Sequence, residues 1–380
     1  MSDTNRKILI LSDTPTHPPV AGNRACILSY AELLKKLGYD VFFLWIAPYK
    51  LKNEEEELTS NYWGDKLLVF KKGLITRLKD SFFEYLRFKL TGYYKIDDLF
   101  PLGFDTYLKT VNSSYDFESV IVNYVFFSKS FENFPNSNKV LFTHDVFTNK
   151  YQLTGSKWFS LTSNQEAKAL NRSNSILAIQ EQEAIFFKSL TSKKVITCYN
   201  HFPITDTPYV GNNTLLYLAG SNDYNIESAT WFIKNAFPVL IKNNPRLVLL
   251  IGGRICDVLK NDFVHPAIEY YGNVENLSDF YSLGDVVINP TFNGTGLKIK
   301  TFEAMSYGKV LISHPHSKIG ILDSENAPIL CAATPEEYLE KVNYIFRNKE
   351  TTEKFKTESI KYIGQLNKVV VNAFKEALNH

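Results

Sequence analysis

Short apolar runs along the chain alternate with segments in which apolar residues recur at helical spacing. Residues 7–11 and 41–46 are apolar runs that predict buried strands. The helical spacing between them stops at Gly38, which predicts a helix that ends at this glycine. The loop over residues 13–23 would then follow a parallel strand, where open α/β sheets place their ligands. A plain surface turn is the alternative for this loop.

The same alternation continues through the rest of the chain. Further strands are expected at residues 119–125, 139–143, 175–179, 215–218, 247–251, 267–271 and 285–289. Strands that alternate with helices imply parallel sheets, and two such series imply an α/β protein with two Rossmann-like domains. We place the domains at 1–200 and 201–380, because residues 199–212 carry two prolines and little periodicity. One further possibility is that the last helix of the chain packs back on the first domain.

One segment, residues 66–95, differs from this pattern. Eight basic residues there interleave with apolar ones, and four consecutive glutamates stand earlier in the chain at 54–57. A basic amphipathic segment can lie on an anionic membrane surface, so one interpretation is a peripheral membrane contact through residues 66–95. The alternative interpretation is an ordinary surface helix with solvated lysines and arginines.

Composition narrows the class of protein. The 380 residues are 44% hydrophobic and 22% charged, as in globular proteins, and the net charge of +2 does not suggest a nucleic-acid-binding protein. The four cysteines are scattered without a Cys/His cluster, so we expect neither a disulfide framework nor a metal site. No signal peptide and no run of 18 apolar residues is apparent, and we expect a cytoplasmic protein, with the inner membrane face as an option.

The densest chemical signal lies at residues 289–305. It follows an expected strand, passes through the Gly-Thr-Gly turn at 294–296, and opens a helix. Glycines let a ligand approach the backbone, and the N-terminal amides of a helix favour an anion. Lys298 and Lys300 add positive charge, and Glu303 could accept hydrogen bonds from ribose or sugar hydroxyls. These residues predict a site for a nucleotide diphosphate, although the spacing is not that of a P-loop.

This segment resembles the donor-binding motif of family-four glycosyltransferases of the GT-B fold. The resemblance rests on Gly-x-Gly-Leu-Lys-x-Lys-x-x-Glu-Ala-Met after an Asn-Pro strand end. Weaker pieces agree in order, at residues 7–12 with Gly22, at 143–145, at 176–183, at 218–221 and at 251–254. The fold implied is two Rossmann-like domains that face each other across a cleft. The activity implied is retaining transfer of a sugar from a nucleotide-diphosphate donor, UDP or GDP, without a metal or other cofactor.

The resemblance also implies roles for single residues. Glu303 would bind the donor ribose, residues 296–298 would line the diphosphate and sugar, and residues 272–274 would hold the base. Gly22 would let the acceptor loop approach the donor, and His144 would sit near the donor sugar. The catalytic candidates are therefore His144, Lys298 and Glu303. The donor-binding candidates are Gly22, Gly220, Arg254, Asn273, Val274, Gly294, Thr295, Gly296, Leu297 and Lys300.

The chain also departs from the family. Many members carry a second glutamate eight positions before the one at 303, where this chain has Thr295. The family's usual arginine is missing from residues 220–225, and Arg254 with the two lysines would substitute for it. The leading hypothesis is a transferase that builds a cell-surface polysaccharide on a glycan or lipid-linked acceptor. The alternatives are a GT-B epimerase or phosphorylase, and a non-catalytic nucleotide-sugar-binding partner; a Rossmann-type oxidoreductase is disfavoured because Gly-x-Gly-x-x-Gly is missing after the first strand.

Plainer roles remain for several of these residues. Glu303 could cap its own helix, Lys300 could point outward, and Arg254 could belong to a surface turn. His144 and Asp145 could form a structural pair.

Overall fold

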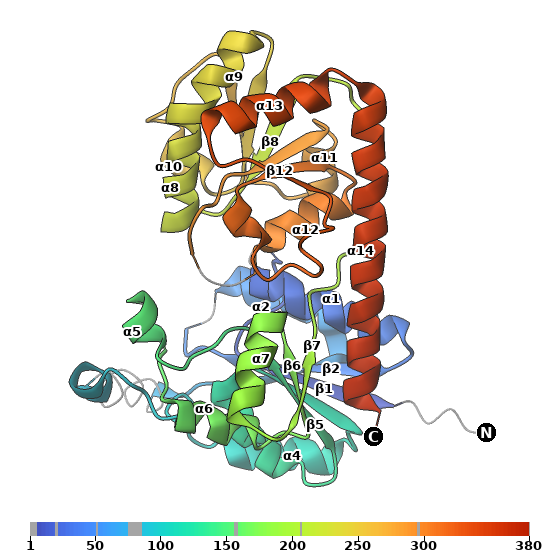
Figure 1. Cartoon of the computed structure of the whole chain (residues 1–380). Helices are drawn as coiled ribbons and strands as arrows, with labels where there is room; N and C mark the ends of the chain where they lie inside the picture. The colour runs from blue at the N-terminus through green and yellow to red at the C-terminus, as the bar shows by residue number, and fades with distance from the viewer. Residues whose placement is uncertain are drawn as a thin grey trace. The chain divides into compact units, whose positions relative to one another are not determined.

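The chain folds into two compact units. The computed structural model describes residues 6–19, 22–50, 52–74, 86–155, 159–205, 207–294 and 297–379. The N-terminal unit comprises residues 1–201 and 369–380, and the C-terminal unit comprises residues 202–368 (Figure 1). Helix α14, Lys349–Leu378, begins in the C-terminal unit, and its last residues belong to the N-terminal unit.

The N-terminal unit is built on a seven-stranded sheet in the order β3-β2-β1-β4-β5-β6-β7, and every described pairing in it is parallel. Its strands are β1 Lys7–Ser12, β2 Asp40–Ala47, β3 Leu67–Lys71, β4 Ser119–Asn123, β5 Asn138–Thr143, β6 Ser175–Ala178 and β7 Lys194–Thr197. Its helical segments are α1 Gly22–Lys36, α2 Asn53–Trp63, η1 Gly64–Lys66, α4 Phe104–Ser114, η2 Val125–Asn133, α5 Lys150–Thr154, α6 Ser163–Leu170 and α7 Glu181–Leu190.

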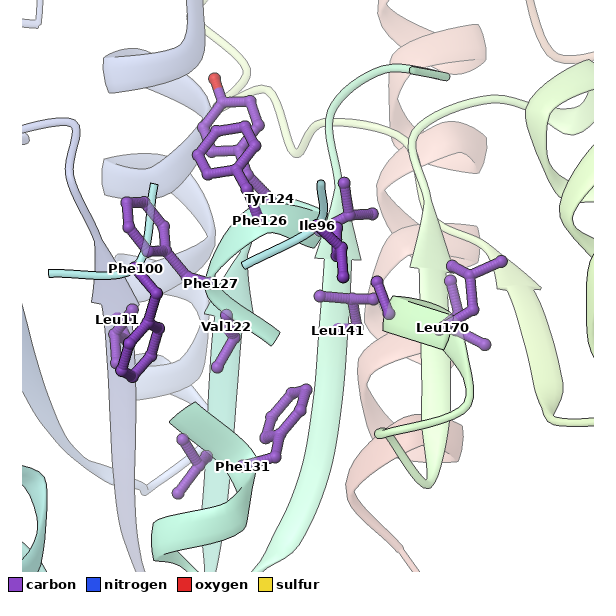
Figure 2. Packing of buried hydrophobic residues seen from close by; sticks show 14 of the residues in the cluster. Leu11, Ile96, Phe100, Val122, Tyr124, Phe126, Phe127, Phe131, Leu141 and Leu170 are labelled. Carbon is purple, nitrogen blue, oxygen red and sulfur yellow. The ribbon is translucent and has the colours of Figure 1, made fainter. Parts of the chain in front are cut away.

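Aromatic side chains fill the core of this unit. Phe126, Phe127 and Phe131 come from η2 and are at most 1% exposed. Figure 2 shows them with Val122 and Leu141 from the neighbouring strands β4 and β5. Large rings remove much apolar surface from water per residue, so a 14% aromatic content gives this sheet a well-buried cover on that face.

Strand β3 corrects the interpretation of residues 66–95 as one amphipathic segment. Residues 67–71 form a parallel edge strand, in which Leu67 pairs with Phe43 and Lys71 with Ala47. The apolar residues of this part therefore serve the sheet rather than a helix face. Residues 75–85 lie outside the described part of the chain.

The C-terminal unit holds a six-stranded sheet in the order β10-β9-β8-β11-β12-β13, again with only parallel pairings among the described strands. Its strands are β8 Thr214–Leu218, β9 Val248–Gly252, β10 Ile268–Gly272, β11 Val286–Asn289, β12 Val310–Ser313 and β13 Ile329–Cys331. Its helical segments, besides the start of α14, are α8 Asp223–Trp231, η3 Phe232–Ala236, α9 Phe237–Asn243, α10 Cys256–Leu259, α11 Leu277–Tyr281, α12 Ile299–Ser306, η4 Pro315–Lys318 and α13 Pro335–Phe346.

Both sheets confirm the predicted α/β fold with two parallel sheets. In each sheet the strand order reverses once, between β1 and β4 in the N-terminal unit and between β8 and β11 in the C-terminal unit. The loops at such a switch point diverge to opposite faces and leave a crevice outside the carboxyl ends of the strands. These two crevices are where the fold places candidate sites. Among the described helices, none is both long and apolar enough to cross a membrane.

Gly253 tests how tightly the strand ends of the C-terminal unit are packed. Its φ is +91°, and a Cβ there would lie 2.4 Å from the carbonyl oxygen of Ala219. We predict that Gly253→Ala lowers the free energy of unfolding by about 3 kcal/mol or more, because strain and backbone overlap add. Gly220→Ala is the matched control: a Cβ there meets no atom within 4 Å, so the free energy should change by less than about 0.5 kcal/mol. Urea unfolding measures both, and equal losses would contradict the prediction.

Candidate active site

A half-buried lysine bridges the switch point of the C-terminal unit. Lys300 lies in the first turn of α12, and its Nζ donates hydrogen bonds to Asn225 Oδ1 at 2.9 Å and Thr291 Oγ1 at 2.7 Å. Asn225 follows β8 and Thr291 follows β11, the two strands between which the sheet order reverses. The ammonium also lies 5.3 Å from the ring centre of Tyr217. Lys300 therefore points inward rather than to solvent.

The partners of Lys300 carry no negative charge. In the part of the chain that the structure describes, no carboxylate forms an ion pair with Lys300. Burial, together with the nearby charge of Lys298, lowers the pKa of Lys300 to about 7. A buried cation without a counter-ion is costly, and an anionic ligand would supply the missing charge. Such a group is a candidate for ligand binding rather than for stability.

Two side chains bind the backbone carbonyl of Gly294, in the glycine turn before α12. Gly294 O accepts hydrogen bonds from Lys298 Nζ at 3.0 Å and from His316 Nε2 at 2.9 Å. Gly294 has a φ of +93°, and a Cβ there would lie 3.0 Å from the ring of Tyr224. Burial lowers the pKa of Lys298. Two cationic side chains, Lys298 and Lys300, therefore stand at the start of one helix, where backbone amides also favour an anion.

Glu303 lies one turn into α12, as the sequence predicts. Its Oε1 accepts a hydrogen bond from the hydroxyl of Tyr281 at 2.8 Å, and burial raises the pKa of its carboxyl group. The ring of Tyr281 stacks on Tyr307 at 4.6 Å, which fixes the hydroxyl. Asn289, the last residue of β11, donates to Thr301 Oγ1 at 3.1 Å and ties the helix to the strand. The capping alternative for Glu303 finds no support, because its described hydrogen bond goes to a tyrosine side chain.

Other predicted donor residues also stand at strand ends of this sheet. Gly220 follows β8, and its carbonyl accepts a hydrogen bond from Asn225 Nδ2 at 3.0 Å, next to the lysine site. Arg254 and Asn273 follow β9 and β10, and both are exposed. Val274 is half-buried against Gly252.

Of the remaining residues predicted for the glycine turn, the structure describes only some. Leu297 is half-buried and directly precedes the lysine that caps α12. Thr295 and Gly296 lie outside the described residues. Sequence reasoning missed Asn225, Thr291 and Tyr281, which hold the predicted lysine and glutamate in place. The signal available for Asn225 was its position after an apolar run, which is weak by itself.

In the N-terminal unit, the half-buried His144 belongs to a hydrogen-bond network at the switch point. Its Nε2 lies 2.8 Å from Asn123 Oδ1, and Asn123 Nδ2 donates to the carbonyl of Leu11 at 3.0 Å. Because the amide nitrogen is committed to that carbonyl, Oδ1 faces His144, whose Nε2 must donate. Burial lowers the pKa of His144 to about 3. Asp145 does not pair with this histidine, because it forms an ion pair with Lys150 instead.

Tyr124 was not predicted and has the least usual backbone at this site. Its φ is +68° with ψ at 141°, a conformation that bulky residues rarely adopt. The ring lies 4.6 Å from that of His144, and the hydroxyl accepts a hydrogen bond from Asn23 Nδ2 at 3.2 Å. Backbone strain of this kind clusters at functional sites, where surrounding contacts maintain it. The predicted Gly22 is the exposed first residue of α1, beside Asn23.

Comparisons with known proteins bear on both units. Residues 212–348 match the family described as glycosyl transferases group 1. Solved structures match over nearly the whole chain: TarM has a TM-score of 0.70 at 11% identity, covering 100% of this chain and 99% of that one. HepE of Anabaena, solved with UDP and glucose, has a TM-score of 0.66 at 11% identity, covering 99% and 100%. The protein is a glycosyltransferase of the GT-B fold.

Two further relatives of this glycosyltransferase complete the comparison. Sucrose-phosphate synthase of Thermosynechococcus elongatus has a TM-score of 0.63 at 13% identity, covering 98% of both chains. An uncharacterized 44.6 kDa protein in the cps region of Klebsiella pneumoniae is 22% identical over 341 residues, 81% of this chain and 82% of its own. The predicted fold and enzyme class are therefore confirmed.

Stability as a function of pH tests the uncompensated charge of Lys300. The pKa of about 7 lies below the ordinary value of 10.5, so the unfolded chain binds more protons between these values and wild-type stability rises with pH across them. Lys300→Met removes this contribution. The free energy of unfolding of the variant, relative to that of wild type, should therefore be highest at about pH 6, and this difference should shrink toward pH 9. Urea unfolding at both pH values measures it; a difference that is independent of pH would contradict the lowered pKa.

The protonation state of His144 gives a second prediction. With its pKa lowered to about 3, the ring should stay neutral, with the proton on Nε2, from pH 8 down to about pH 5. Long-range ¹H–¹⁵N NMR of the histidine rings reads the tautomer directly, and His144→Gln assigns the signal. Titration of that signal near the ordinary value of 6.5 would contradict the burial of the ring.

Proposed function

We propose that this glycosyltransferase transfers a sugar, with retention of anomeric configuration, from a UDP- or GDP-sugar to a glycan or lipid-linked acceptor during synthesis of a cell-surface polysaccharide. Relatives support parts of this proposal. HepE has been solved with UDP-glucose, and the pneumococcal O-GlcNAc transferase GtfA with UDP and GlcNAc. The relative from the cps region supports a role in polysaccharide synthesis.

The observation that carries the proposal is the pair of lysines at the start of α12. Among the described residues, Lys300 donates its hydrogen bonds to neutral partners, and Lys298 is bound to a backbone carbonyl. A diphosphate placed there would meet two ammonium groups and the N-terminus of a helix. This is the arrangement that a nucleotide-diphosphate donor requires, at the switch point where α/β sheets bind such ligands.

The same groups would serve the chemical step. When the anomeric bond breaks, negative charge develops on the leaving diphosphate, and Lys298 and Lys300 would stabilise it. Loss of one preorganised group of this kind costs about 3–4 kcal/mol of transition-state stabilisation. Glu303, oriented by Tyr281, would accept hydrogen bonds from the ribose or sugar hydroxyls. Because the protein's own cations would neutralise the diphosphate, the reaction should proceed in the presence of EDTA.

In the N-terminal unit, the neutral His144 would offer Nδ1 as an acceptor, since Nε2 is committed to Asn123. The strained Tyr124 and its partner Asn23 stand beside it and are the candidates for acceptor contacts. Arg254 is exposed on the C-terminal unit and is the weakest of the proposed diphosphate ligands.

A panel of nucleotides and nucleotide sugars tests the donor proposal. One class of donor should raise the Tm of the wild type, since a ligand at 100 times its Kd adds about 2.7 kcal/mol. Lys300→Met and Glu303→Gln should lose most of this shift, and kcat should fall about 10²–10³-fold in Lys300→Met. Lys242→Met is the matched control, because Lys242 is an exposed lysine on α9 of the same unit.

The products separate the alternatives. A transferase releases the nucleotide when acceptor is present, and NMR of the product gives the anomeric configuration. An epimerase would convert the donor without an acceptor, and a non-catalytic partner would gain thermal stability without releasing nucleotide. If no nucleotide sugar raises the Tm, or if the lysine variants respond like wild type, the proposed donor site is wrong.

A further inference from the structure

A carboxylate stands beside the glycine turn of the candidate donor site. Glu227 lies on α8, and its Oε2 accepts a hydrogen bond from Asn293 Nδ2 at 2.6 Å. Asn293 directly precedes Gly294, where an added Cβ would lie 3.0 Å from the ring of Tyr224. Tyr224 and Glu227 are three positions apart on α8, so both belong to the same face of this helix. That face therefore borders the glycine turn.

The contact between Glu227 and Asn293 spans the switch point of the C-terminal unit. Helix α8 follows β8, and Asn293 lies in the loop after β11, so the hydrogen bond joins the two sides of the crevice. Lys300 makes a similar connection, from the start of α12 to Asn225, which lies two positions before Glu227 on α8. The carboxylate and the proposed diphosphate site are therefore neighbours along the same helix.

The orientation of the Asn293 amide leaves one of its own atoms without a partner. Nδ2 must face Glu227, because a carboxylate accepts hydrogen bonds and an amide oxygen cannot donate one. Oδ1 of Asn293 is then buried and meets no hydrogen-bond donor among the described residues. A buried acceptor of this kind destabilises a fold, so stability does not explain the arrangement. Local arrangements that oppose stability are typical of functional sites.

Glu227 retains the capacity to bind a ligand. Its side chain is exposed, and Asn293 occupies only one of its two carboxylate oxygens. Within the described part of the chain, no lysine or arginine forms an ion pair with Glu227, and no group donates to Oε1. This oxygen is therefore available to a hydroxyl or an ammonium group of a ligand.

We propose that Glu227 recognises the sugar of the nucleotide-sugar donor and selects a neutral or amino sugar over a uronic acid. This inference rests on the proposed function, because it requires a diphosphate at Lys298 and Lys300. The sugar is bonded directly to the diphosphate and would lie beside the same glycine turn. There, Glu227 would accept hydrogen bonds from hydroxyl or ammonium groups of the sugar and would repel a sugar carboxylate.

The charge of Glu227 supports the sugar as its partner. A negative charge beside the glycine turn weakens the binding of a diphosphate, so the phosphates do not explain its position. Hydrogen-bond donors of a sugar would offset this repulsion, and a uronic acid would add to it. The chemical class selected is therefore a donor whose sugar carries no negative charge.

Isothermal titration calorimetry of the full-length protein with matched donors tests this selection. UDP-glucose is compared with UDP-glucuronic acid, and GDP-mannose with GDP-mannuronic acid, in the pair whose nucleotide binds. Wild type should bind the neutral donor about threefold more tightly or better, and high salt should narrow this ratio. In Glu227→Gln the ratio should fall toward one. The two donors of a pair share their nucleotide, so the ratio cancels any effect of the variant on diphosphate binding.

A purely structural role of Glu227 predicts a different result. Glutamine also offers an oxygen to Asn293, so Glu227→Gln keeps the hydrogen bond and removes only the charge. A ratio that stays at the wild-type value in this variant overturns the proposal, as does wild type that binds the uronic acid as tightly as the neutral donor. Glu269→Gln is the matched control, because Glu269 is an exposed glutamate on β10 of the same unit, and its ratio should equal that of wild type. Both variants should keep the wild-type Tm within a few degrees.

The same titrations separate this inference from the proposed function. If neither UDP nor GDP binds wild type, the proposed donor site is wrong and the selection by Glu227 is wrong with it. If a nucleotide binds and Lys300→Met weakens that binding, while Glu227→Gln leaves the ratio unchanged, the donor site is supported and only the selection by Glu227 is wrong.

Discussion

The candidate donor site is arranged around one constraint. The ammonium group of Lys300, half-buried at the switch point of the C-terminal unit, has no carboxylate partner among the residues that the structure describes. The charge of Lys300 is stabilised by neutral oxygens from Asn225 and Thr291 and by the face of the Tyr217 ring, but none of these groups neutralises it. Asn225 lies in the first turn of α8, which follows β8, and Thr291 lies in the loop after β11. The same lysine therefore ties the starts of α8 and α12 to the loop of the strand adjacent to β8. A carboxylate in place of either partner would stabilise the lysine and remove its attraction for a diphosphate.

Much of this arrangement could be predicted from the sequence, for local reasons. Apolar runs gave the positions of β4, β5, β8 and β11 to within one or two residues, because strands buried on both faces are continuously apolar. The Gly-x-Gly-Leu-Lys-x-Lys-x-x-Glu pattern gave α12 and its glutamate, because glycine turns and helix starts depend on neighbouring residues.

What depends on distant contacts could not be predicted. Whether Lys300 points inward is decided by Asn225, 75 positions earlier in the chain. Strand β3 was read as part of an amphipathic segment, because an edge strand of five residues owes its structure to the pairing with β2. The positive φ of Tyr124 could not be predicted either, because a bulky residue at that position gives no sign of an unusual backbone.

Isothermal titration calorimetry of UDP or GDP binding, repeated in two buffers of different ionisation enthalpy, tests the central claim most directly. With its pKa near 7 in the free protein, Lys300 is only partly protonated at about pH 7.5, and a bound diphosphate should draw a proton onto it. The account predicts a fractional proton uptake for each nucleotide bound by wild type, and its loss together with most of the affinity in Lys300→Met. Binding with the same heat in both buffers, or equal proton uptake by the variant, would contradict it.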